Sequence, residues 1–116
     1  MKNRLSVLLL GLALATASVG CTKDSELVSS CQVPGSKDGS SFCRDVPHGA
    51  KDKGKQWCTL IGALMPTKWE EDSLCNQTDA LGGCKLKSGE VNWYYRSEKH
   101  QSSTDVESDC AGTFIP

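Results

Sequence analysis

Seven cysteines constrain this chain of 116 residues more than any other feature of its sequence. Cys21 follows an apolar N-terminal run, and the others are spread over the remainder of the chain: Cys31, Cys43, Cys58, Cys75, Cys84 and Cys110. Six cysteines can form three disulfides, and disulfides persist in exported proteins because their compartments are oxidising. The cysteine count therefore predicts a disulfide-stapled domain, with one sulfur left over.

The N-terminus predicts export. Lys2 and Arg4 precede an apolar run from Leu5 to Ala17, which is too short to cross a bilayer but suits the apolar region of an export signal. Two cleavage sites compete. Ala15-Thr16-Ala17 has the small-x-small pattern of ordinary signal peptidase and would leave a secreted or periplasmic protein, whereas the second site lies directly before Cys21.

We favour the second site, because Ser18-Val19-Gly20-Cys21 resembles the lipobox of bacterial lipoproteins. The whole chain resembles small cysteine-rich lipoproteins of the bacterial cell envelope. This resemblance implies that Cys21 carries the acyl chains and that the membrane is a partner through this N-terminal lipid. Thr22, in place of an aspartate, implies the outer membrane by similarity to enterobacterial lipoproteins. Lipidation would also use the seventh sulfur; the alternative is a free thiol or an intermolecular bridge.

These features divide the chain into a signal peptide (1–20), a lipid anchor and tether (21–30) and a single disulfide-stapled domain (31–116). Asp24 or Ser25 can cap a helix in the tether, where Leu27 and Cys31 are four positions apart. The mature chain has only 15 Leu, Ile, Val and Phe residues, so disulfides worth about 2–4 kcal/mol each must supply much of its stability. Loss of Lys2 and Arg4 leaves it mildly acidic, so nucleic acid is not expected as a partner.

The stretch from Leu81 to Arg96 predicts a β-hairpin, with turn residues at Lys87-Ser88-Gly89-Glu90. Alternation in the second strand puts Val91, Trp93 and Tyr95 on a core face. Asn92, Tyr94 and Arg96 are then expected on the opposite, solvent face. An aromatic ring between an amide and a guanidinium is an arrangement that can contact a protein or glycan ligand, so these three residues are the candidate ligand contacts.

Other segments predict the remaining elements. The apolar run from Gln56 to Met65 predicts two short strands that turn at Gly62. Thr67-x-x-Glu70 and Thr104-x-x-Glu107 are capping-box patterns, which predict short helices to Cys75 and to Cys110. The order hairpin, helix, hairpin, helix indicates a small disulfide-rich α+β fold with a possible two-fold quasi-repeat.

The quasi-repeat leads to a hypothesis about the disulfides. If each unit closes on itself, the pairs are Cys31–Cys43, Cys58–Cys75 and Cys84–Cys110. Six cysteines allow 15 connectivities, and sequence alone does not choose among them.

Catalytic and metal-binding patterns are missing from the sequence. There is no Cys-x-x-Cys pair, and His48 and His100 lie in polar segments, so neither a metal nor a cofactor is expected. No cysteine is spare as a nucleophile, and no Gly-x-Ser-x-Gly turn presents a serine. We therefore expect a non-enzymatic, membrane-anchored binding module. The alternatives are a secreted inhibitor-like or toxin-like module and, third, a small envelope enzyme with an unrecognised site.

Intact-mass spectrometry of the mature protein tests both the lipidation of Cys21 and the pairing of the other six cysteines. We expect a chain that begins at Cys21, carries acyl mass and lacks one hydrogen for each of the other six cysteines, because these are paired. Cleavage after Ala17 without added acyl mass would contradict the lipoprotein prediction. A full complement of hydrogens on freshly purified, unreduced protein would contradict the three disulfides.

Overall fold

The structure, a computed structural model, describes residues 22–116. The predicted signal peptide and Cys21 lie outside the described residues. The elements are β1 (Leu27–Val33), β2 (Ser41–Pro47), the 3-10 turn η2 (His48–Ala50), α2 (Lys51–Ile61), β3 (Lys68–Glu70), β4 (Ala80–Lys85), β5 (Val91–Tyr95), α3 (Ser103–Asp109) and β6 (Thr113–Ile115). The prediction of a small disulfide-rich α+β fold is confirmed.

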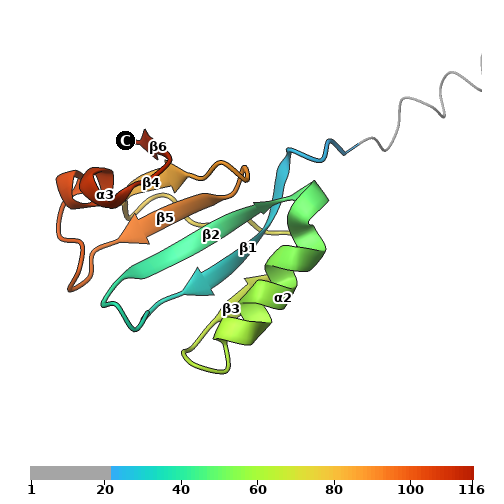
Figure 1. Cartoon of the computed structure of the whole chain (residues 1–116), viewed down its shortest axis with the longest axis horizontal. Coiled ribbons are helices and arrows are strands. Elements are labelled where there is room, and N and C mark those ends of the chain that lie inside the picture. The colour runs from blue at the N-terminus through green and yellow to red at the C-terminus, as the bar shows by residue number, and fades with distance from the viewer. Residues whose placement is uncertain (1–21) are drawn as a thin grey trace, which may run out of the picture.

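The six strands form one sheet of antiparallel pairs in the order β3-β1-β2-β5-β4-β6. In Figure 1, α2 lies across the β1–β2 half of the sheet and α3 lies beside β4 at the other end. Side chains of neighbouring strand residues point to opposite faces of a sheet. We call the face that carries Cys31 and Cys84, bonded to α2 and to the end of α3, the helix face, and the opposite one the loop face.

Strand register explains which cysteines can pair. Cys31 lies opposite Arg44 in the β1–β2 pair, whereas Cys43 lies opposite Gln32, so Cys31 and Cys43 point to opposite faces. The predicted bonds Cys31–Cys43 and Cys58–Cys75 are therefore wrong. Cys31 bonds to Cys58, which α2 holds over the helix face, and Cys43 bonds to Cys75 in the loop between β3 and β4. The predicted bond Cys84–Cys110 is confirmed.

The predicted hairpin is confirmed as β4 and β5. Its turn closes through the Leu86 N–H, which donates to the Glu90 carbonyl at 2.8 Å. Gly89 has a φ of 92°, a left-handed conformation that glycine adopts without a steric penalty. Val91 and Trp93 are buried on the loop face with Tyr95 packed against them, as the alternation predicted.

Two strands predicted between Gln56 and Met65 are wrong, because most of this run belongs to α2. Gly54 and Cys58 are the buried residues of the helix, and Trp57, Ile61 and Met65 pack beside Cys58 in the same core cluster. These core positions recur every three or four residues, which is the period of a helix rather than that of a strand. Gly62 is the C-cap, and its N–H donates to the Cys58 carbonyl at 3.1 Å.

The helix predicted after Thr67 is also wrong. The Thr67 hydroxyl donates to the Cys58 carbonyl at 3.1 Å. It therefore supplies a hydrogen bond to a backbone carbonyl in the last turn of α2, instead of capping the start of a new helix. The following residues pair with β1 as the short edge strand β3. The quasi-repeat is not seen, since a helix and a strand stand where the first hairpin and helix were expected.

The second predicted helix is present as α3, although its cap lies earlier than expected. The Ser102 hydroxyl, rather than that of Thr104, accepts from the Asp105 N–H at 3.3 Å. Val106 is 1% exposed and is the buried residue of this helix.

The tether is shorter than predicted and is not helical. β1 begins at Leu27, and the Asp24 and Glu26 carbonyls accept from the N–H groups of Gly49 and His48. The domain therefore takes in residues that the sequence assigned to the tether, because β1 needs them to pair with β2 along its length.

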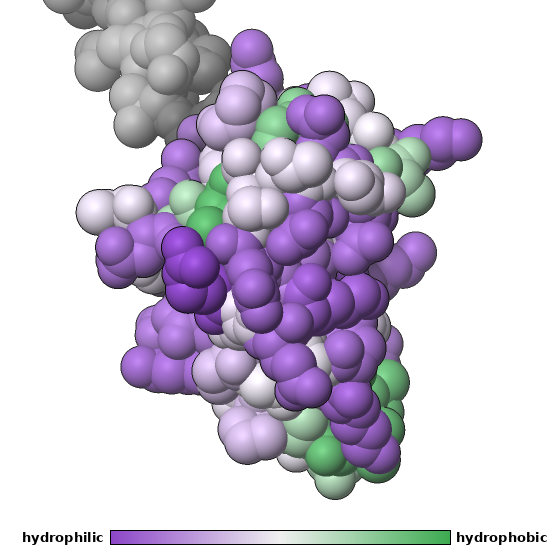
Figure 2. Space-filling view, turned by 90° about the vertical axis from the view of Figure 1, so that its left-hand side faces the viewer, coloured by the Kyte–Doolittle hydropathy of each residue, from purple (hydrophilic) through white to green (hydrophobic). Residues whose placement is uncertain are grey.

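The surface is largely hydrophilic on the side of α3, as Figure 2 shows. Hydrophobic residues gather at the lower end of that view, where Figure 1 has the C-terminal end of α2 and the loop to β3. Leu60 and Leu64, from these segments, are 67% and 64% exposed. Neither helix within residues 22–116 has the length and apolar character needed to cross a bilayer.

Substitution of Gly54 tests how closely α2 packs on β2. A Cβ at this position would lie 2.7 Å from the Cγ1 atom of Val46, which is fully buried. We expect Gly54→Ala to lower the free energy of unfolding by about 1 kcal/mol, because overpacking exceeds the gain in helix propensity. Denaturant unfolding measures the change.

Gly35→Ala is the matched control, since nothing lies within 4 Å of the added Cβ. It should leave the unfolding free energy unchanged or slightly higher. A more stable Gly54→Ala variant would show that α2 does not contact β2 as described.

Candidate functional site

The three predicted ligand contacts do not form an exposed surface together. Asn92 is only 5% exposed, and Tyr94 is half-buried against Phe42 and His100, with ring centroids 5.7 and 4.8 Å apart. Of the three, only Arg96 is exposed. The expected solvent exposure of Asn92 and Tyr94 is wrong because residues from β2 and from the segment before α3 cover this face of β5.

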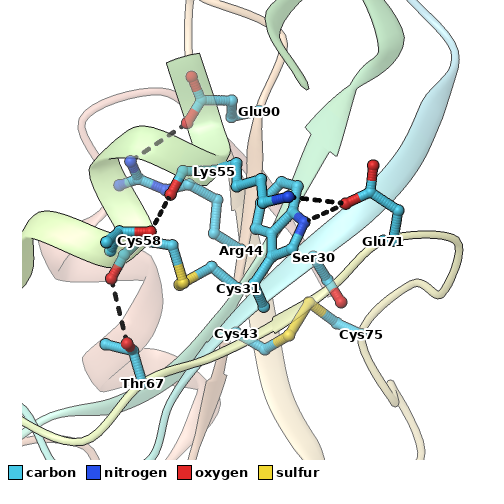
Figure 3. Close-up of a disulfide and its surroundings, with 12 residues drawn as sticks. Ser30, Cys31, Cys43, Arg44, Lys55, Cys58, Thr67, Glu71, Cys75 and Glu90 are labelled. Carbon is cyan, nitrogen blue, oxygen red and sulfur yellow. Dashed lines mark hydrogen bonds and ion pairs between the residues drawn. A yellow bond between two sulfur atoms is a disulfide. The ribbon is translucent and has the colours of Figure 1, made fainter. Parts of the chain in front are cut away.

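Asn92 belongs to a polar network on the helix face, centred on Arg44. The Arg44 Nε donates to the Asn92 Oδ1 at 2.7 Å, and Arg44 Nη1 lies 3.1 Å from a Glu90 carboxylate oxygen (Figure 3). The guanidinium also lies 4.0 Å from the ring centroid of Trp57 on α2. Burial lowers the pKa of Arg44, and the Glu90 charge opposes this shift. The guanidinium is therefore fully engaged within the fold, which gives it a structural role.

His100 is a buried residue that the sequence placed in a polar loop. Its side chain is 2% exposed, and Nε2 lies 2.7 Å from an Asp109 carboxylate oxygen near the end of α3. Nδ1 has no hydrogen-bond partner within the described part of the chain. The ring also packs against Tyr94 of β5, so His100 links α3, through Asp109, to β5.

On the loop face, Asp45 holds the β3–β4 loop (residues 71–79) against the sheet. Its carboxylate accepts from the Cys75 N–H at 2.7 Å and from the Trp93 indole N–H at 3.0 Å. The Cys43–Cys75 disulfide crosslinks the same loop to β2, as Figure 3 shows. The Ser30 hydroxyl adds a hydrogen bond of 2.7 Å to the Ser73 carbonyl. The loop is thus attached at several points along its first half.

A pocket of about 350 Å³ lies where this loop meets the ends of β1, β2 and β5; we call it the loop-face pocket. Its lining residues are Gln32, Pro34, Ser41, Phe42, Cys43, Asn76, Asp79 and Tyr95. Ser41 and Tyr95 are directly opposite in the β2–β5 pair, and Gln32 is opposite Cys43 in the β1–β2 pair. The sheet therefore fixes the positions of these four lining residues and of Phe42, whose ring packs against Trp57 and Tyr94 on the helix face.

The loop supplies the other polar groups of the loop-face pocket. The Tyr95 hydroxyl donates to the Asn76 backbone carbonyl, and the Asn76 side chain accepts from the Thr78 N–H at 2.9 Å. Burial raises the pKa of the Tyr95 hydroxyl, and the charges of Asp45 and Asp79 raise it further. The pocket is thus a concave site with amides, hydroxyls and one carboxylate around aromatic and sulfur atoms, which suits binding of a small molecule.

Comparisons with protein-family models, curated proteins and solved structures find no match. The interpretation of the site therefore rests on its own geometry. Across residues 22–116, no three His, Cys, Asp or Glu side chains gather in a way that could hold a metal ion.

The Asp45→Asn variant tests how Asp45 holds the loop. Burial raises the pKa of Asp45, although the hydrogen bonds from Cys75 and Trp93 oppose the shift. Because the folded pKa exceeds the unfolded one, the contribution of Asp45 to stability is complete below the unfolded pKa and is lost as the pH rises through the folded pKa. In Asp45→Asn, the side-chain NH2 group would also face one of these two N–H donors and leave it without an acceptor, which lowers the free energy of unfolding by about 1–3 kcal/mol.

We expect the unfolding free energy of the natural protein to exceed that of Asp45→Asn most below pH 3.8, the ordinary pKa of an aspartate, and this difference to shrink as the pH rises through the raised folded pKa. Denaturant unfolding across this pH range measures the difference. The exposed Asp72, changed to Asn, is the control for the loss of a carboxylate from the same loop, and this change should cost far less stability at low pH than Asp45→Asn does. A difference for Asp45→Asn that grows with pH would contradict a raised pKa.

Proposed function

We propose that this protein is a lipid-anchored lipoprotein of the bacterial cell envelope, in the outer membrane, and that it binds a small ligand in the loop-face pocket without catalysing a reaction. The observation that carries the proposal is the convergence of polar side chains on a concavity whose walls are crosslinked by Cys43–Cys75. A site built on strands and a crosslinked loop loses little conformational entropy when a ligand binds.

The position of the pocket suits a membrane-anchored protein. Asp24, three positions after Cys21, already makes a backbone hydrogen bond to Gly49 of the fold, so an acyl chain on Cys21 would hold the domain close to the bilayer. Gln32 lies five residues further along β1 than Leu27, a distance of about 17 Å in an extended strand. The loop-face pocket is therefore at the end of β1 remote from the anchor, where a soluble ligand can reach it.

The chemistry of the lining favours binding over catalysis. The described lining has a single carboxylate, that of Asp79, and contains no histidine, lysine or unpaired cysteine. General acid–base or nucleophilic catalysis usually needs such a group beside a second one that activates it.

Blocking the pocket tests the proposal. The probe is a panel of small soluble fragments that spans cationic, neutral and anionic compounds, added to the full-length, nitrogen-15-labelled chain in an uncharged detergent. We expect the NMR shifts caused by binding fragments to centre on Ser41, Asn76, Asp79 and Tyr95. Ser41→Phe should abolish these shifts, because the aromatic ring fills the concavity.

Ser88→Phe, in the exposed turn between β4 and β5, is the matched control and should leave the shifts intact. A thermal melt of both variants verifies folding. Fragment shifts that are scattered over the surface, or that persist in a folded Ser41→Phe variant, would contradict the proposed function.

A further inference from the structure

We infer that the loop-face pocket takes a small organic cation, whose ammonium group is held at the Asp79 carboxylate. This inference rests on the proposed function, because it names the class of ligand for the same pocket. It is carried by the charge, the hydrogen-bonding groups and the apolar surface that line the concavity.

The first observation is the sign of the charge. Asp79 is exposed at the pocket and is its one ionised side chain; no described lining residue is Lys, Arg or His. Within residues 22–116, Asp79 makes no ion pair within 4.0 Å, unlike Glu71 and Asp38, which pair with Lys51 and Lys99. Its negative charge is therefore available to a ligand, and an anion would meet repulsion with no compensating cation.

The second observation is a set of hydrogen-bond acceptors in the lining, beside the amide donors of Gln32 and Asn76. The Tyr95 hydroxyl uses its proton on the Asn76 carbonyl, so its oxygen offers only lone pairs to any other partner. The side-chain carbonyl oxygen of Gln32 and the hydroxyl oxygen of Ser41 can accept as well. An ammonium group carries three donors and no acceptor, so it is complementary to this set.

The third observation is a second carboxyl group on the same face of the sheet. Asp45 lies on the loop face next to Cys43, a lining residue, with its carboxylate bound to Trp93 and Cys75. The charges of Asp45 and Asp79 both raise the pKa of the Tyr95 hydroxyl, although burial is the larger cause. The Asp79 carboxylate thus favours a cation over an anion near Tyr95, and Asp45 adds to this preference when it is ionised.

The apolar part of the lining fits the organic part of such a ligand. The Tyr95 ring, the Pro34 side chain and the Cys43 sulfur can contact a hydrocarbon body, and an aromatic face also attracts a cation. A volume of about 350 Å³ admits a ligand the size of a substituted six-membered ring, rather than a long chain or a protein segment.

The experiment compares three probes that share one ring and differ in charge: cyclohexylammonium, cyclohexanol and cyclohexanecarboxylate. Each is titrated into the full-length labelled chain in an uncharged detergent, at low and at high sodium chloride. We expect cyclohexylammonium to bind roughly tenfold or more tightly than cyclohexanol, as a charge-assisted hydrogen bond allows, and to weaken with salt. Cyclohexanecarboxylate should leave the pocket resonances unmoved.

Asp79→Asn should remove the preference for the cation, so that cyclohexylammonium and cyclohexanol bind the variant with equal affinity. Asp72→Asn, an exposed acid of the same loop but outside the lining, is the control and should change neither affinity. Equal binding of the ammonium and the alcohol, or an ammonium affinity unaffected by Asp79→Asn, would overturn the inference.

The failure of this inference is distinct from the failure of the proposed function. Cyclohexanol binding that Ser41→Phe abolishes would keep the pocket as a ligand site while removing its preference for cations. If none of the three probes moves the pocket resonances, the inference is overturned, and the fragment panel decides the proposed function separately.

Discussion

Three disulfides determine how this sheet is covered, and the rest of the structure depends on them. Cys31 and Cys84 belong to one row across the four central strands. Cys31 bonds to Cys58 in α2, and Cys84 bonds to Cys110 just after α3, so both bonds attach helices to the same face. Cys43, in the neighbouring row, bonds to a loop on the opposite face. Helices as short as α2 and α3 are marginal in isolation, so covalent attachment supplies much of what holds them on the sheet.

Between the disulfides, two adjacent residues of β2 take the place of a larger apolar core. Arg44 points to the helix face, where it joins β5 to α2, and Asp45 points to the loop face, where it holds Cys75 and Trp93. Buried polar groups are tolerated when they have hydrogen-bond partners, and both side chains make several such contacts. Together with the disulfides, these contacts help to cover both faces of a small sheet with few large apolar side chains.

Local patterns predicted the parts of the fold that depend on neighbouring residues. The hairpin of β4 and β5 and the helix before Cys110 follow from turn residues and a short-range cap, and both are present. The same logic failed between Gln56 and Met65, where a run of apolar residues suits a strand or a helix equally well. Packing on the sheet decides for the helix: Gly54 lets α2 approach Val46 closely, and Cys58 packs in a core cluster with Cys31, and both contacts span separate elements. Two of the disulfides were mispredicted for the related reason that the β1–β2 register assigns Cys31 and Cys43 to opposite faces.

The loop-face pocket could not be read from the sequence because it depends on pairings between distant residues. Ser41 meets Tyr95 only through the β2–β5 ladder, and Asn76 reaches Tyr95 only because Cys75 is tied to Cys43 and Asp45. The same interactions that compensate for a thin core therefore form the walls of the cavity. A loop fixed at Cys75 leaves the four residues that follow it, up to Asp79, to lie against the strand ends with little freedom. In a domain this small, the crosslinks that staple the fold therefore also fix the walls of the pocket.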